Sequence, residues 1–132
     1  MCKTCEDTIN KIWQNIAQGQ TYRMPDLNRG ATFRVIDVNK EWIKISTQTA
    51  QNILKLKNAF ISTIHYLKEN KHYKYNSCEI RSSNDRNLSG PLCQTSRDNN
   101  YNVCCINYIL PILFCNNIVG IDGNRLNKPW LF

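Results

Sequence analysis

Thr32-Phe-Arg-Val-Ile-Asp-Val38 is followed, after two residues, by Glu41-Trp-Ile-Lys-Ile-Ser-Thr47, and this pair of runs is the strongest indication of a β-sheet in the chain. Both runs are rich in β-branched and aromatic residues, and both alternate apolar with polar positions as a half-buried strand does. Because only Asn39-Lys40 separates them, we expect an antiparallel hairpin. Residues 52–57 fit a short third strand beside it.

An amphipathic helix is expected ahead of this hairpin, over about residues 4–17. The apolar positions that recur at helical spacing are Cys5, Ile9, Ile12, Trp13 and Ile16. Thr4 is the expected N-cap, and Gly19 is the expected end of the helix. Residues 20–30 are rich in turn-forming residues and are expected to form a loop.

The second half of the chain is expected to be mainly helical. Residues 59–67 form a helical pattern with Asn58 as its N-cap, residues 78–81 fit a short strand, and residues 91–97 fit a short helix. Residues 103–115 repeat apolar side chains at helical spacing, but Pro111 removes one helix hydrogen bond. We expect a kinked helix there, and a helix that stops near Tyr108 is the alternative. Asp122-Gly123 between apolar runs predicts a C-terminal hairpin.

These elements predict an α+β fold and one compact domain over residues 1–132. Residues 1–57 hold the N-terminal helix and a small antiparallel β-meander. From residue 58 the order is helix, short strand, short helix, turn, helix and hairpin. This order resembles the winged-helix DNA-binding domains, in which the helix before the hairpin enters the major groove and the hairpin is a wing on the backbone. The resemblance lies in element order alone, without a fingerprint motif.

The charge of the chain favours a polyanionic partner. Seventeen Lys and Arg residues face ten Asp and Glu residues, which gives a net charge of +7. Residues 55–97 carry eight basic and three acidic residues, a net +5, so the middle third is the expected electrostatic footprint. The alternative is a charged surface that only maintains solubility.

The winged-helix resemblance implies a set of nucleic-acid-binding residues near the expected groove helix and wing. They are Arg81, Arg86, Arg97, Asn100, Asn102, Arg125 and Lys128. Arginine and lysine suit phosphates, and asparagine can bond the N6 and N7 atoms of adenine. The alternative for the asparagines is a capping turn without any role in base recognition.

The cysteines are expected to be reduced and without a metal. Seven is an odd number, and the start of the chain has no apolar segment typical of a secretory signal, so we expect a reducing, cytoplasmic environment. Cys2 and Cys5 have zinc-knuckle spacing, but a closed site needs two further ligands. The sequence offers only the adjacent Cys104 and Cys105 as near partners, so no metal or other cofactor is expected. A redox role for Cys2 and Cys5 lacks a preceding strand.

The sequence contains no motif that indicates a particular enzymatic reaction. A restriction-type nuclease would need an acid and a lysine on one face of a strand, but Glu41 and Lys44 are three apart and point to opposite faces. Neither a nucleophile elbow nor a glycine-rich phosphate loop is present. The large aromatic residues at periodic positions, which are Trp13, Phe33, Trp42 and Phe60, are expected in the core.

The sequence therefore predicts a non-catalytic nucleic-acid-binding protein, with double-stranded DNA as the expected ligand. A protein-interaction module, such as an accessory subunit of a nucleoprotein or defence system, is the first alternative. A small nuclease or a zinc-dependent enzyme is the second. No membrane partner is expected, because the longest apolar run is far shorter than the roughly 18 residues of a spanning helix. The oligomeric state stays open.

Overall fold

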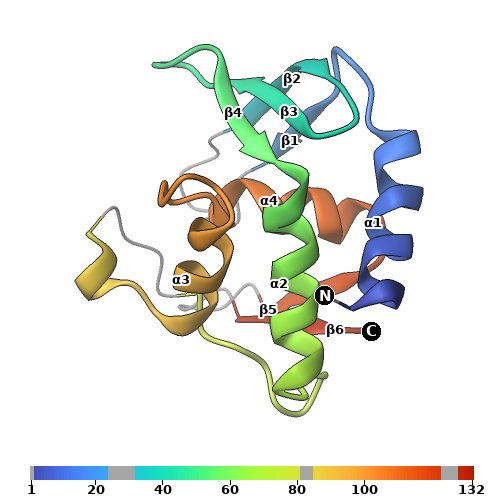
Figure 1. The fold of residues 1–132 in the computed structure, drawn as a ribbon, viewed down its shortest axis with the longest axis vertical. Helices are drawn as coiled ribbons and strands as arrows, with labels where there is room; N and C mark the ends of the chain where they lie inside the picture. The colour runs from blue at the N-terminus through green and yellow to red at the C-terminus, as the bar shows by residue number, and fades with distance from the viewer. Residues whose placement is uncertain (1, 24–31, 81–84, 123–127) are drawn as a thin grey trace.

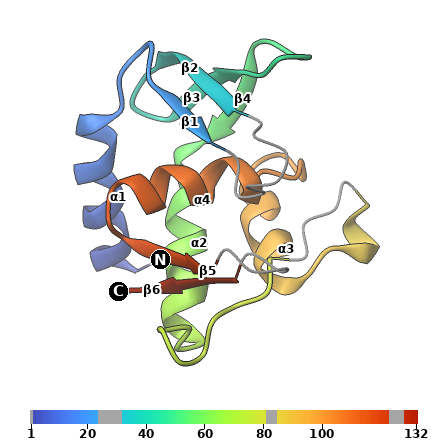
Figure 2. The same cartoon turned by 180° about the vertical axis from the view of Figure 1, so that it is seen from behind.

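A computed structural model of the protein describes residues 2–23, 32–80, 85–122 and 128–132. A four-stranded sheet forms one layer, the helices pack beneath it, and a two-stranded hairpin lies on the far side of the helices (Figures 1 and 2). The elements in chain order are α1 (Lys3–Asn15), β1 (Thr21–Arg23), β2 (Thr32–Val38), β3 (Trp42–Ser46), β4 (Ile53–Leu56), α2 (Lys57–Glu69), the 3₁₀ helix η1 (Arg86–Leu88), α3 (Pro91–Asp98), α4 (Ile106–Cys115), β5 (Val119–Asp122) and β6 (Lys128–Leu131). The predicted α+β class is confirmed.

The larger sheet has the order β1-β2-β3-β4, and each neighbouring pair is antiparallel. The predicted hairpin is β2 and β3, and the predicted third strand is β4. Strand β1 was expected to be loop; it pairs with β2 through Tyr22 and Phe33. Alternation sends Val35 and Ile43 into the core and leaves Lys44 on the outer face.

Helix α1 packs its apolar stripe against α2. Its N-cap is Cys2, whose sulfur accepts a hydrogen bond from the backbone of Cys5, and not Thr4 as the sequence predicts. The helix ends at Asn15, well before Gly19. Trp13 is buried as expected, with its ring edge-on to Phe60 at a centroid distance of 5.0 Å. This contact joins α1 to the middle of the molecule.

Helix α2 follows β4 without a break. It begins at Lys57, and its N-cap is Leu56, not Asn58. The backbone N–H of Leu56 donates to the side-chain oxygen of Asn100 at 2.9 Å, so a residue from the loop after α3 holds the strand-to-helix junction. In both views α2 crosses the centre of the molecule, between α1 and α3 (Figures 1 and 2).

The winged-helix arrangement expected for residues 58–132 is not confirmed. Helix α4, the element expected to enter a DNA groove, lies between the sheet and the β5–β6 hairpin, as Figure 2 shows. Its buried residues are Ile106, Ile109, Leu110, Pro111, Ile112 and Leu113. The helix runs through Pro111 to Cys115, so the alternative of an end near Tyr108 is wrong. A helix buried to this extent has no free face for a groove.

The short strand expected at residues 78–81 is also absent from the described part of that segment, residues 78–80. The backbone N–H of Cys78 still donates to the carbonyl of Pro129, so the segment runs beside the C-terminal hairpin. That hairpin, β5 and β6, forms as predicted, with Asp122 paired to Lys128. Gly120 lies opposite Trp130, and a Cβ atom on Gly120 would come within 2.4 Å of the indole. Only glycine therefore fits at this position.

Among the described residues, no helix combines the length and the apolar character needed to cross a bilayer.

Candidate functional site

Two of the predicted nucleic-acid-binding residues are internal. Arg97 is 4% exposed, and its guanidinium donates to the backbone carbonyl of Asn102. Asn100 is 1% exposed; it accepts from the N–H of Leu56, and its amide donates to the carbonyl of Val103. Burial of this degree argues against phosphate or base contacts by either side chain and favours the capping-turn alternative for Asn100.

Arg86 and Asn102 lie at the surface, but they bind each other. The guanidinium of Arg86 forms an ion pair with Asp98 and donates to the side-chain oxygen of Asn102 at 3.0 Å. The hydrogen bond to Asp98 raises the pKa of Arg86. The carboxylate of Asp98 neutralises the charge that a phosphate would need. Arg81 and Arg125 lie outside the described residues, as does the side chain of Lys128, so their predicted role stays a prediction.

A different basic site opens where α1, the β2–β3 turn and the start of α2 meet. It is a wide, open depression of the surface with a volume of about 710 Å³. The polar and aromatic side chains of its wall are Asn10, Trp13, Gln14, Asn39, Lys40 and Lys57. None of the described residues that line it is acidic. We call this depression the lysine pocket.

Hydrogen bonds of the backbone hold both lysines of the lysine pocket in position. Asn39 accepts from the backbone N–H groups of Glu41 and Trp42 through its side chain, and this turn holds Lys40 at its tip. Lys57 is the first residue of α2; its backbone N–H donates to the carbonyl of Glu41, and its ammonium lies 5.8 Å from the centroid of the Trp13 ring. The positive end of the α2 dipole therefore lies at the pocket wall and adds to the attraction for an anion.

The outer face of the sheet carries a further lysine, Lys44. Lys44 places its ammonium 5.0 Å from the centroid of the Trp42 ring, and Trp42 pairs with Leu56, the residue before Lys57. The prediction that Trp42 is a core residue is wrong, whereas Trp13, Phe33 and Phe60 are buried. Side chains two apart on a strand share a face, so Trp42 belongs with Lys44 and not with the buried Ile43.

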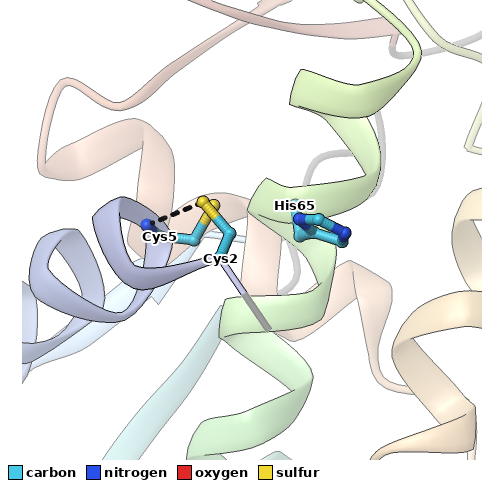
Figure 3. Close-up of side chains that lie close together, drawn as sticks. All are labelled: Cys2, Cys5 and His65. Carbon is cyan, nitrogen blue, oxygen red and sulfur yellow. Dashed lines mark hydrogen bonds between the residues drawn. The ribbon is translucent and has the colours of Figure 1, made fainter.

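A second cluster joins three residues from two helices: Cys2 and Cys5 at the start of α1, and His65 in the middle of α2. Figure 3 shows the two sulfur atoms close together, with the imidazole beside them. The ligand atoms of all three residues lie within 4.8 Å of one another. Among the described residues, no other group of three or more His, Cys, Asp or Glu side chains converges in this way. The sequence gives no sign that His65 meets Cys2, because the two are joined only by packing of α1 on α2.

The two thiols of this cluster differ in acidity. Hydrogen bonds, first from Cys5 and then from Thr4, lower the pKa of the Cys2 thiol to about 6. Burial, followed by the nearby Cys2, raises the pKa of the Cys5 thiol to about 11. At neutral pH the pair therefore holds one thiolate and one thiol, and the thiolate is the form that attacks electrophiles and binds metals.

Cys93 and Cys104 form another pair, with their sulfur atoms 3.6 Å apart. Hydrogen bonding to Cys93, together with burial, raises the pKa of Cys104 well above its usual range. Burial raises the pKa of the neighbouring Cys105 to about 11. The thiols of Cys104 and Cys105 therefore stay protonated at neutral pH, which makes them poor nucleophiles.

Comparison with models of protein families, with curated proteins and with solved structures gives no match to this chain.

Proposed function

We propose that the protein binds nucleic acid at the lysine pocket, through the sugar–phosphate backbone and without catalysis. The observation that carries the proposal is that Lys40 and Lys57 both line one depression, which also presents amides and has no acidic lining residue among those described. Ammonium and amide N–H groups are the donors that proteins use most on phosphate oxygens. The +7 net charge supplies the long-range attraction.

The proposal does not include base recognition by α4. That helix is buried, and Asn100, one of the residues expected to read a base, is bound within the protein. Phosphate contacts position a duplex without reading its sequence. We therefore expect binding of similar strength to duplexes of different sequence, with double-stranded DNA as the first ligand to test.

The test is a salt titration of DNA affinity with charge-matched variants. Each phosphate contact lowers the slope of log affinity against log salt by about 0.9. Lys40→Ala with Lys57→Ala should weaken binding to all duplexes and flatten this slope by up to about 2. Lys3→Ala with Lys74→Ala removes the same charge from exposed positions outside the pocket and should leave the slope nearly unchanged. Glu41→Gln removes an acid from the turn that carries Lys40 and should strengthen binding.

Three results would contradict the proposal. Absence of any duplex binding at about 50 mM salt would reject nucleic acid as the ligand. Equal losses in the pocket and control variants would mean that net charge alone drives association. Binding that survives loss of both pocket lysines but disappears with Arg125→Ala and Lys128→Ala would reject the pocket and place the interface on the C-terminal hairpin.

A protein partner is the second candidate. Three large apolar side chains near the Arg86–Asp98–Asn102 link are exposed, with Leu88 at 69%, Tyr101 at 75% and Val103 at 52%. Exposed apolar groups beside a fixed polar network are typical of protein-binding surfaces. A role as an accessory subunit of a larger nucleoprotein or defence assembly would combine this surface with the lysine pocket. Leu88→Ser with Tyr101→Ser should then abolish assembly but not DNA binding.

The state of the cysteines bears on the cellular compartment of the protein. All seven cysteines are free, including Cys93 and Cys104, whose sulfur atoms lie 3.6 Å apart. Cytoplasmic reductants keep such pairs reduced. We propose a cytoplasmic location on this ground, and thiol counting on protein taken directly from its native cell should give seven reduced cysteines.

A further inference from the structure

The cluster of Cys2, Cys5 and His65 has a polar atom that the protein itself leaves unsatisfied. Nδ1 of His65 is buried and has no hydrogen-bond partner among the described residues. A buried polar atom without a partner is unfavourable, and a bound water or ion is one of the features that account for such an atom in a native protein. The ligand atoms of His65 and of both cysteines lie within 4.8 Å of one another. A metal ion bound between these three side chains would therefore give Nδ1 a partner.

The surroundings of the cluster suit thiolate and imidazole ligands. The backbone N–H of Cys5 donates to the sulfur of Cys2 at 3.3 Å, and the ammonium of Lys68 lies 4.0 Å from the same sulfur. Both groups stabilise negative charge on Cys2. On the other side of the ring, Nε2 of His65 lies 4.0 Å from a carboxylate oxygen of Glu69. At 4.0 Å this carboxylate makes no hydrogen bond to the ring, but it is the kind of group that lies behind metal-binding histidines.

We propose that Cys2, Cys5 and His65 bind one Zn²⁺ ion, through the two sulfur atoms and Nδ1, with a water molecule in the fourth position. Sulfur and imidazole nitrogen are the ligands that zinc prefers in tetrahedral sites, and C-x-x-C spacing in the first turn of a helix presents both sulfur atoms to one ion. Three protein ligands with one open position distinguish this site from a closed structural zinc site. Both sulfur atoms bind as thiolates, and any proton that a sulfur still carries passes to solvent, so the bound site with two thiolates and Zn²⁺ is neutral.

Zinc resolves the conflict between the two cysteines. The two sulfur atoms lie close together and Cys5 is buried, so two thiolates at this place repel each other when no cation lies between them. A divalent cation between them removes this repulsion and offsets the loss of solvation. The ion would also tie the start of α1 to the middle of α2, two elements that are otherwise joined here by the hydrogen bond from Lys68 to Thr4 and by side-chain packing.

The test is metal binding to the whole purified protein, freed of metal by a chelator under reducing conditions. We expect one Zn²⁺ per chain in competition with a chromophoric chelator, and a Co²⁺ derivative with a thiolate-to-cobalt charge-transfer band. Cys2→Ser, Cys5→Ser and His65→Ala should each weaken zinc binding at least tenfold. Cys115→Ser and His72→Ala remove the same residue types outside the cluster and should bind as tightly as the unchanged protein.

A second measurement covers the case in which a variant folds poorly. Cys2 is only half-buried, so Cys2→Ser should keep the circular dichroism spectrum of the parent while it loses the cobalt band. Zinc should raise the melting temperature of the parent and not that of Cys2→Ser. Less than half an equivalent of zinc at saturation, equal zinc affinity in His72→Ala and His65→Ala, or a Cys2–Cys5 disulfide in protein prepared under reducing conditions would overturn the proposal.

Discussion

The ammonium of Lys55 donates a hydrogen bond to the backbone carbonyl of Cys104, at 3.3 Å, from a residue that is only 1% exposed. The same ammonium lies 4.8 Å from the centroid of the Tyr108 ring. No carboxylate of the described residues pairs with it. Lysine faces inward because β4 alternates, and position 55 shares the inner face with the apolar positions of β2 and β3. Burial lowers the pKa of Lys55.

This lowered pKa predicts a pH-dependent contribution to stability. Between the folded pKa and the unfolded value near 10.4, the unfolded chain holds a proton on Lys55 that the folded protein has lost. The contribution of Lys55 to the free energy of unfolding therefore rises with pH in this window, by at most about 1.4 kcal/mol per pH unit. The buried thiols act in the opposite direction at alkaline pH, because their folded pKa values are raised.

The difference between the parent and Lys55→Met isolates the lysine. Lys55→Met should be the more stable protein at pH 7, and its advantage should shrink as the pH rises toward 10. Denaturant titrations at several pH values measure this difference. Lys74→Met, at an exposed position, serves as the control and should keep a constant offset. An offset for Lys55→Met that is equally constant would mean that the ammonium stays protonated in the fold.

Loss of the Trp13 side chain should destabilise the protein strongly. Its indole N–H donates to the carbonyl of Asn39 at 2.6 Å, and its ring packs on Phe60. Truncation of a buried tryptophan to alanine costs about 3–5 kcal/mol. Trp13→Phe keeps most of the packing and loses the hydrogen bond, so it should cost less. A Trp13→Ala protein that melts within a degree or two of the parent would show that the residue is not part of the core.

Asn100→Ala should reduce stability and leave nucleic-acid binding unchanged. The substitution removes the acceptor of the Leu56 N–H at the start of α2, and an unsatisfied buried N–H costs about 1–3 kcal/mol. Asn100→Asp keeps an oxygen acceptor and should recover part of the loss. Unfolding curves give the stability, and a DNA titration well below the melting temperature gives the affinity. A loss of affinity confined to one DNA sequence would restore the role in base recognition that the sequence suggests.

Cys2 should be the first cysteine to react with iodoacetamide in zinc-free protein at neutral pH. Its pKa of about 6 makes it mostly thiolate, whereas burial raises the pKa of the exposed Cys115 thiol. Thr4→Ala removes a hydrogen bond that lowers the Cys2 pKa and should slow the reaction; Thr8→Ala is the matched control. Peptide mapping by mass spectrometry measures each site. Faster labelling of Cys115 would contradict the acidity of Cys2.

The sequence predicts those elements that carry their own periodic pattern. The β2–β3 hairpin, α1, α2, α3 and the C-terminal hairpin all appear close to their expected places. Strand β1 was missed because it has only three residues and exists through its pairing with β2. Residues 78–80 have strand-like composition, but a single hydrogen bond to Pro129 does not make a strand. Whether β1 and residues 78–80 form strands depends on the segment that each one pairs with, and the local amino-acid composition does not identify that segment.

The functional sites were harder to foresee for the same reason. Arg97 and Asn100 have residue types suited to nucleic acid, yet tertiary contacts draw both into the interior. In the sequence alone, Lys40 is only a charged residue in a hairpin turn. The fold brings it and Lys57 of α2 into the lining of the same depression. His65 meets the two N-terminal cysteines only after α1 and α2 have packed together. Each site depends on contacts between segments that are far apart in the chain.

The central position of α2 also bears on how the protein is made. The segments that contact this helix are synthesised on both sides of it: α1 and β4 come earlier, while α3, α4 and β6 come later. A nascent chain that has emerged from the ribosome as far as Glu69 can bury Phe60 against Trp13. The other side of α2 then still faces water. At that stage the half-formed core is a target for chaperones that hold apolar surfaces, and for self-association. Segments that leave the ribosome after α2 are thus the ones that close the core, and slow translation of these segments would prolong the vulnerable period.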